Sequence, residues 1–295
     1  MRDFRGRVAV VTGAGSGIGR ALAVELATRG ARLALSDFST EGLTGTAAAC
    51  VERGAEVRTY HLDVADRSAV LAHARQVRQD FGGADLVVNN AGVTLLASIT
   101  EATWEDIRWV MDVDFWGVVH GTRAFLPMLV ASGGHLVNVS SMYGMVPAPA
   151  QSAYNAAKFA VRGFTESVLQ EMRVGRLPVG VSCVYPGQVR TGILRHARVG
   201  RGLGYQGLRE RFAEEARTSP EQAARTILRG VLANRPKILV GADARRVDLL
   251  SRLLGSAYPR LTARRARREA DRARTDAMRA RLAAQRVRRS DPRPQ

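Results

Sequence analysis

Short runs of apolar, mostly β-branched residues alternate along the chain with longer segments whose apolar residues recur about every 3.6 positions. The short runs predict strands at Val8–Val11, Arg32–Leu35, Val57–Tyr60, Leu86–Val88, Leu136–Val139, Val179–Val184 and Ile238–Val240. The longer segments predict helices at Ile18–Thr28, Ser68–Phe81, Trp104–Leu129 and Ala153–Met172, with further helical sequence after Pro220. This alternation predicts an α/β fold, in which a doubly wound, mostly parallel sheet carries helices on both faces.

Composition supports a folded body and sets the end of the chain apart. The chain has 295 residues, of which 46% are hydrophobic, so disorder throughout is excluded. Of the net charge of +17, residues 244–295 carry +11, with 16 arginines against 5 acids. We therefore predict a globular domain at residues 1–243 and a helical, Arg/Ala-rich extension at residues 244–295, frayed beyond Ser290.

The extension leaves several interpretations open. Small residues recur in it at spacings of three and four, at Ala263, Ala266, Ala270, Ala273, Ala277, Ala280, Ala284 and Val287. Such a seam predicts a helix docked on another surface, such as a neighbouring subunit, and a mobile solvated arm is the alternative. The charge also suits nucleic acid or an anionic membrane surface. Residues 263–289 of the extension have no aromatic residues for base stacking and few large apolar residues for insertion, so we expect no nucleic-acid partner and rank the membrane surface low.

Cysteine usage and the N-terminus indicate the compartment. Two cysteines, Cys50 and Cys183, cannot form a disulfide framework, which favours a reducing environment. The N-terminal sequence has no signal-peptide pattern, and no run approaches the ~18 apolar residues of a membrane helix. We expect a cytoplasmic protein. The five histidines are scattered, so we expect no catalytic metal.

A glycine-rich turn between the first strand and the first helix is the first candidate for chemistry. Such a turn lets backbone N–H groups approach a pyrophosphate, and the helix N-terminus adds partial positive charge. Asp37 follows the second strand, where a carboxylate accepts hydrogen bonds from ribose hydroxyls and repels a 2′-phosphate. This favours NAD over NADP, and a turn or helix-cap role is the alternative for Asp37. The residues assigned to the turn are Gly13, Ser16, Gly17, Ile18 and Gly19.

Small and polar residues also follow the next two strands. Asp63 and Val64 come after the third strand, and Asn90, Ala91 and Gly92 come after the fourth. Ligands of open α/β sheets lie beyond the carboxyl ends of the strands, so an adenine and a ribose would rest here. Taken separately, each of these two groups of residues is explained equally well as an ordinary turn with no ligand.

Tyr154 and Lys158 are the most informative residues of the chain. They lie four apart on a predicted helix and so share one face, while Ser141 ends the preceding strand. A nearby ammonium favours the phenolate and lowers the pKa of a tyrosine, which can then exchange a proton with an alcohol or carbonyl oxygen. The chain has 42 arginines and only two lysines, so the lysine at this position stands out. A hydride carrier bound at the glycine turn would complete the chemistry.

These motifs, in this order, resemble the short-chain dehydrogenase/reductase family in its single-domain form, over about residues 5–243. The resemblance implies a seven-stranded Rossmann-like sheet, hydride transfer at nicotinamide C4, and a homodimer or homotetramer. It implies that residues 1–243 are the catalytic and dinucleotide-binding domain, with Ser141, Tyr154 and Lys158 as the catalytic set. Tyr154 and Lys158 also bind the cofactor in this family, and a further stretch is similar to the segment that holds the nicotinamide carboxamide, namely Pro186, Gly187, Val189 and Thr191.

The chain departs from the family pattern at Asp114, where the family often has an asparagine. In the family, the backbone carbonyl at this place helps to hold a water in a proton relay to the lysine. A backbone role survives the change, so the resemblance implies that Asp114 is a fourth catalytic residue. An ionised Asp114 near Lys158 would offset part of the positive field that acts on Tyr154.

Apolar loops after the fourth, fifth and sixth strands favour a small hydrophobic alcohol or ketone as substrate. The sixth-strand loop, from Ile193 to Tyr205, is spaced by glycines, which suits a mobile lid. We therefore predict an NAD-dependent alcohol dehydrogenase or carbonyl reductase. The alternatives are an NADPH-dependent reductase of carrier-bound 3-oxoacyl groups and, from a different class, a cofactor-binding regulator or scaffold that acts through its basic tail.

Overall fold

A computed structural model describes residues 1–194, 196–200, 216–258, 263–264 and 267. Its centre is a seven-stranded sheet whose strands all run parallel, in the order β3-β2-β1-β4-β6-β7-β9. The strands are β1 (Val8–Thr12), β2 (Arg32–Asp37), β3 (Val57–His61), β4 (Leu86–Asn89), β6 (His135–Val139), β7 (Gly180–Pro186) and β9 (Lys237–Val240). Because the strands are parallel, their carboxyl ends meet at one edge of the sheet.

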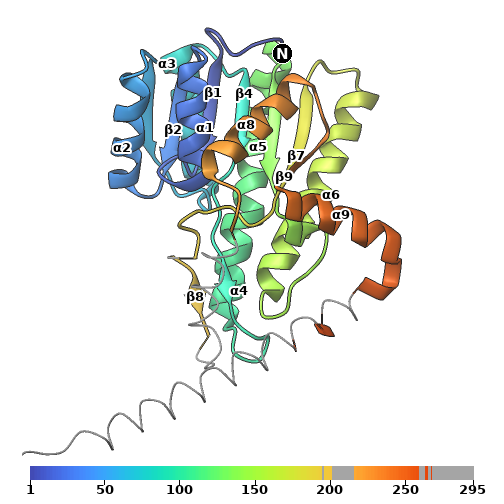
Figure 1. Ribbon diagram of the computed structural model, residues 1–295. Coiled ribbons are helices and arrows are strands. Elements are labelled where there is room, and N and C mark those ends of the chain that lie inside the picture. Colours follow the sequence, from blue (N-terminus) through green and yellow to red (C-terminus); the bar gives the residue numbers. More distant parts are fainter. Residues whose placement is uncertain (195, 201–215, 259–262, 265–266, 268–295) are drawn as a thin grey trace, which may run out of the picture.

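Helices cover both faces of this sheet, as Figure 1 shows. One face carries α1 (Gly17–Thr28), α2 (Thr40–Val51) and α8 (Pro220–Leu232), and α1 packs against its two neighbours. The other face carries α3 (Arg67–Phe81), α5 (Gly117–Ser132) and α6 (Ser152–Val174). The predicted fold class, a Rossmann-like seven-stranded parallel sheet with helices on both faces, is confirmed.

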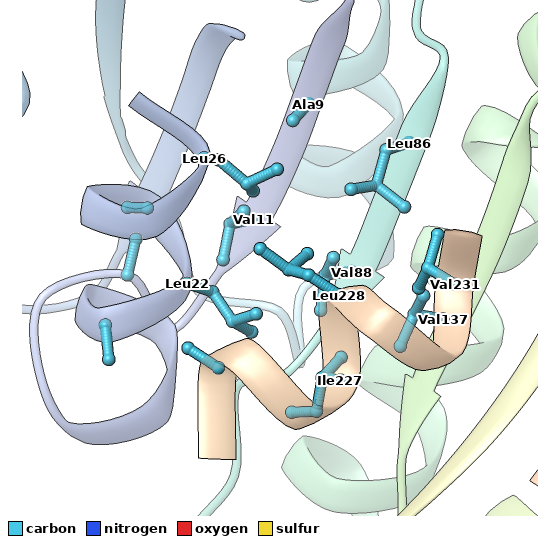
Figure 2. Packing of buried hydrophobic residues seen from close by; sticks show 14 of the residues in the cluster. Ala9, Val11, Leu22, Leu26, Leu86, Val88, Val137, Ile227, Leu228 and Val231 are labelled. Carbon is cyan, nitrogen blue, oxygen red and sulfur yellow. The ribbon is translucent and has the colours of Figure 1, made fainter. Parts of the chain in front are cut away.

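Alternate side chains of each strand enter the two layers. In β1, Ala9 and Val11 face the α1 and α8 layer, whereas Val8 and Val10 face the α3, α5 and α6 layer. Figure 2 shows the first layer, where leucines of α1 and apolar residues of α8 meet β1, β4 and β6. Strands buried on both faces read as continuous apolar runs, and these runs are the pattern that predicted them.

Two local features differ from the sequence prediction. The segment predicted as one helix from Trp104 to Leu129 consists of α4 (Trp104–Met111), a π-helical turn η1 (Asp112–Trp116) and α5. A short second sheet pairs β5 (Leu95–Leu96) with β8 (Arg198–Val199), and neither strand was predicted. A wide turn and a two-residue strand leave no periodic signal, because both depend on contacts distant in sequence.

The helix α9 (Ala242–Leu254) crosses the predicted domain boundary at residue 243. Its Ala244 is fully buried in a cluster with Met142, Cys183 and Tyr185. The division into two parts stays a prediction. Most of the alanine seam lies outside the described residues, as do Arg195 and residues 201–205 of the predicted lid. Among the described residues, no helix is long and apolar enough to cross a membrane.

Leu228 of α8 tests the core layer. Its side chain is fully buried in the layer of Figure 2, so Leu228→Ala should lower the free energy of unfolding by about 2–5 kcal/mol. Leu253 of α9 is the matched control, since 73% of it is exposed and Leu253→Ala should cost less than about 0.5 kcal/mol. Urea unfolding of both variants measures the difference. Equal effects would contradict this account of the core.

Candidate active site

The glycine turn lies between β1 and α1 at the carboxyl edge of the sheet. Gly13 and Gly17 have φ values of +64° and +51°, a backbone region that favours glycine. A Cβ on Gly19 would lie 2.0 Å from the Gly13 carbonyl oxygen. Ser16 is the N-cap of α1, and its side chain makes no capping hydrogen bond, so the first amides of the helix are not satisfied by their own cap. A tight glycine cradle with such amides fits a pyrophosphate.

Asp37 at the end of β2 braces this turn. Its Oδ2 accepts a hydrogen bond from the Gly15 amide at 2.7 Å, and its Oδ1 accepts one from the Ser39 amide at 2.8 Å. The cap of α2 is Ser39 rather than Asp37. Arg20, which the sequence analysis missed, donates to the Gly15 carbonyl at 2.6 Å and to Thr46 at 2.9 Å. The carboxylate of Asp37 is therefore hydrogen-bonded to the glycine turn and lies beside the cradle.

The residues after β4 are tied to the same turn through Thr12. The Thr12 hydroxyl accepts hydrogen bonds from the amides of Asn90 and Ala91 at 3.0 and 3.1 Å. The Asn90 side chain donates to the carbonyls of Thr12 and Gly13. A Cβ on Gly92 would lie 3.3 Å from the Lys158 Nζ. This segment thus joins the glycine turn to the lysine.

Asp63 and Val64 follow β3 as predicted. Asp63 is exposed, and its Oδ1 accepts a hydrogen bond from the Ala65 amide. Val64 is buried, and a Cβ on Gly117 would lie 2.8 Å from its side chain. The exposed carboxylate is available to a ligand at the sheet edge, whereas Val64 packs against the start of α5.

The segment after β7 is hydrogen-bonded to the start of α9. The Asp243 Oδ2 accepts a hydrogen bond from the Gln188 amide, a contact that the sequence analysis missed. Val189 is buried and bridges to Thr218. A Cβ on Gly17 would lie 3.1 Å from the Thr191 side chain. The structure therefore brings the predicted carboxamide segment, which includes Pro186 and Gly187, against the glycine turn.

The predicted catalytic residues come together beside these segments. Tyr154 and Lys158 lie one turn apart near the start of α6, and the Lys158 Nζ is 5.6 Å from the centre of the Tyr154 ring. Ser141 follows β6, and its hydroxyl accepts a hydrogen bond from the Tyr143 amide at 3.1 Å. Asp114 of η1 lies 3.0 Å from the Lys158 Nζ, and both side chains are buried.

Burial controls the protonation of this cluster. It raises the pKa of Tyr154, an effect that Lys158 and a hydrogen bond from Ser141 oppose and that Asp114 reinforces. Burial alone would lower the pKa of Lys158, but Asp114 and Tyr154 raise it, and the net shift is upward. Lys158 therefore acts on Tyr154 in the predicted direction, and Asp114 offsets that action, also as predicted. The expectation that the pKa of Tyr154 is lowered overall is wrong, because the effect of burial outweighs that of Lys158.

A buried polar network that the sequence pattern does not predict fixes the position of this cluster. The Asn89 side chain of β4 donates to the Asn138 side chain of β6 at 2.8 Å, and Asn138 donates to Thr165 of α6 at 3.0 Å. Ser140 donates to the Lys158 carbonyl at 2.8 Å. Buried polar groups of this kind must be paired, so the network fixes α6 against the two central strands.

Apolar residues pack against Tyr154. Tyr154 shares a cluster with Leu95 and with the partly buried Val93 and Tyr143. Arg198 of β8 forms an ion pair with Asp106 at 2.9 Å. A separate cavity of about 380 Å³ lies at the opposite edge of the sheet, around Gly133, Gly134, Val179 and Gly180, and is remote from this site. No group of three or more potential metal ligands occurs among the described residues.

The family model described as short chain dehydrogenase matches residues 7–201. The chain belongs to the short-chain dehydrogenase family. Over 265 residues it is 52% identical to the oxidoreductase SadH of Mycobacterium tuberculosis, covering 89% of this chain and 96% of that one. It is 29% identical to estradiol 17-beta-dehydrogenase 11 of Homo sapiens, covering 87% of this chain and 82% of that one.

Solved structures of this short-chain dehydrogenase family agree. A short chain dehydrogenase/reductase from Burkholderia phymatum in complex with NAD matches with a TM-score of 0.81 and 31% identity, covering 86% of this chain and 95% of that one. The family assignment made from the sequence motifs is confirmed, and the chain is an oxidoreductase of this family.

Gly19 tests the cradle. The Cβ added by Gly19→Ala would collide with the Gly13 carbonyl, so we expect NADH affinity to fall at least about tenfold, the equivalent of about 1.4 kcal/mol. Gly45→Ala in α2 is the matched control, since its Cβ would meet only the end of Arg20 at 3.9 Å, and affinity should hold. Fluorescence titration with NADH measures both, with circular dichroism to verify folding. A folded Gly19→Ala variant with unchanged affinity would contradict the cradle.

Proposed function

We propose that the protein transfers a hydride between a nicotinamide cofactor and a small hydrophobic secondary alcohol or ketone, with Tyr154 as the general acid/base. The observation that carries the proposal is the placement of Tyr154, Lys158 and Ser141 beside the glycine turn, at one edge of the sheet. A phenol, an ammonium and a hydroxyl next to a dinucleotide cradle suit proton transfer coupled to hydride transfer.

The glycine turn and the segment from Pro186 to Thr191 would hold a nicotinamide dinucleotide, which would supply the hydride for reduction. In that direction the Tyr154 hydroxyl gives its proton to the carbonyl oxygen of the substrate. Ser141 donates a hydrogen bond to the same oxygen and orients it. Lys158 stabilises the phenolate that remains after proton transfer. In oxidation, the phenolate accepts the alcohol proton, so atoms and charge balance in both directions.

NAD is the proposed cofactor. Asp37 lies beside the cradle with its carboxylate on the Gly15 amide, and a carboxylate there repels a 2′-phosphate. The bound NAD of the Burkholderia phymatum relative supports the same choice. The NADPH-dependent 3-oxoacyl reductase is the second candidate, and the pairing of Arg198 with Asp106 weighs against it, because that cation is not free for an acidic carrier.

The remaining expectations stay proposals. We infer a cytoplasmic homodimer or homotetramer, as the family resemblance implies. Both cysteines are free and buried, which fits a reducing compartment. A regulator or scaffold that acts through its basic tail would not need a complete Tyr154, Lys158 and Ser141 set, so we rank that alternative below the enzyme.

Tyr154→Phe tests the mechanism. The change removes only the phenolic O–H, so turnover should fall about 10²–10⁴-fold while NADH binding is kept. Tyr60→Phe is the matched control, because the Tyr60 hydroxyl bonds Asp80 at 2.7 Å, away from the cradle, and turnover should persist. NADH oxidation with a panel of steroid, terpenoid and aliphatic ketones measures both variants. A Tyr154→Phe variant that retains half the activity would refute the mechanism.

A second change tests cofactor choice. Phe38 is 69% exposed next to Asp37, so an arginine there can reach a 2′-phosphate. Asp37→Ala with Phe38→Arg should shift the ratio of kcat/KM values from NADH towards NADPH by at least about tenfold. Side-by-side kinetics with the two cofactors provide the measurement, and an unmutated protein that prefers NADPH would overturn the assignment.

A further inference from the structure

The ammonium of Lys158 is buried against a carboxylate. Lys158 is 3% exposed and Asp114 is fully buried, with 3.0 Å between the Lys158 Nζ and the Asp114 Oδ2. The two residues come from different elements, α6 and η1, which pack together. A lysine buried without a partner tends to lose its proton, so the carboxylate keeps Lys158 charged.

The carboxylate is itself fixed in place. The Asp114 Oδ1 accepts a hydrogen bond from the Val93 amide at 2.7 Å, and the Lys158 Nζ donates to the Val139 carbonyl at 3.3 Å. Burial raises the pKa of Asp114, and Lys158 and the hydrogen bond from the Val93 amide oppose that rise. Both side chains are thus held by backbone groups of neighbouring segments. An asparagine could occupy the volume of Asp114, but it would carry no negative charge.

The pair has an electrostatic consequence for Tyr154. A bare ammonium one helical turn away favours the phenolate, and an adjacent carboxylate cancels much of that field in a poorly solvated site. We propose that Asp114 is a positioning residue that neutralises the field of Lys158 at Tyr154 and so keeps the phenol protonated, as a proton donor, at neutral pH. This inference rests on the proposed function of Tyr154 and adds to it the residue that sets its protonation.

The other ionisable groups around Tyr154 leave this balance intact. The pKa of the Cys183 thiol is raised to about 11 by burial, so this thiol is uncharged at neutral pH. Asp106 is paired with Arg198. The elements packed against α6 contribute these ionisable groups: Asp112 and Asp114 from η1, Tyr143 from η2 (Met142–Gly144), Cys183 and Tyr185 from β7, His135 from the amino end of β6, and Glu105, Asp106 and Arg108 from α4. The helix α6 itself carries Lys158, Arg162, Glu166, Glu171 and Arg173, and Arg162 is paired with Glu166.

The protonation of Tyr154 supports the same picture. Its pKa is raised, first by burial, and Asp114 adds to the rise against Lys158. A protonated phenol serves reduction, and an ionised phenol serves oxidation. Raising this pKa therefore widens the pH range in which the site reduces a ketone and moves alcohol oxidation to alkaline pH, without altering the equilibrium of the reaction.

The test follows the phenol directly and needs no substrate. Protein labelled with [¹³Cζ]tyrosine carries six tyrosines, and the Tyr154 signal is assigned from its loss in Tyr154→Phe. We expect the acid dissociation constant of Tyr154 to rise at least about tenfold in Asp114→Asn, which is one pH unit in the titration midpoint. Asp112→Asn on the same turn is the matched control, and it should leave the midpoint in place because the ion pair of Lys158 is with Asp114.

Three outcomes would overturn the inference. The first is an unchanged midpoint in a folded Asp114→Asn variant, and the second is an equal shift in Asp112→Asn. The third needs no variant at Asp114, since a Tyr154 phenol already ionised at pH 8 in the unmutated protein contradicts the proposal. Turnover in Tyr154→Phe tests the proposed function separately, so a failure of either claim can be distinguished from a failure of the other.

Discussion

A charge cannot be buried alone in this fold, and that constraint shapes the centre of the site. Lys158 enters the interior on α6, and its ammonium takes Asp114 and the Val139 carbonyl as partners. Asp114 lies on the π-helical turn η1, which interrupts the long α4–α5 segment, and its Oδ1 accepts a hydrogen bond from the Val93 amide. The segment after β4, the end of β6 and two helices are thus joined at one ion pair. Breaking such a pair from one side leaves an uncompensated buried charge, which is strongly destabilising.

The second constraint is close approach at the carboxyl edge of the sheet. The glycine turn, the Asn90 segment and the Thr191 segment come so near one another that side chains are excluded at Gly19 and restricted at Gly17. Thr12 and Asn90 fill the remaining space with hydrogen bonds to backbone groups. Glycines at these positions allow the segments to pack closely and leave backbone amides accessible at the cradle. The same residues therefore serve both packing and ligand binding.

Much of this was predictable from the sequence, and the exceptions share a reason. Strands buried on both faces are continuous apolar runs, so the sequence predicts them. Tyr154 and Lys158 are four residues apart on a helix, so the sequence also predicts that their side chains share one face. The π-helical turn, the β5–β8 pair and the Asp243 contact with Gln188 depend on partners far along the chain. The periodicity of apolar residues along the sequence does not predict such contacts. Likewise, the sequence indicated that Lys158 lowers the pKa of Tyr154, but the larger effect of burial requires the packed structure.

The most direct test of the central ion pair uses the lysine content of the chain. Lys158 and Lys237 are its only lysines, so protein labelled with [¹⁵Nζ]lysine gives two signals, and Lys237→Arg assigns them. The pKa of Lys158 is raised by Asp114 and Tyr154 against the effect of burial, so its nitrogen should keep the chemical shift of an ammonium from pH 6 to pH 10. In Asp114→Asn the ammonium should lose its proton at a lower pH than in the unmutated protein, but still above the pH at which Tyr154 ionises. A Lys158 signal at the neutral-amine position at pH 7 in the unmutated protein would contradict the account.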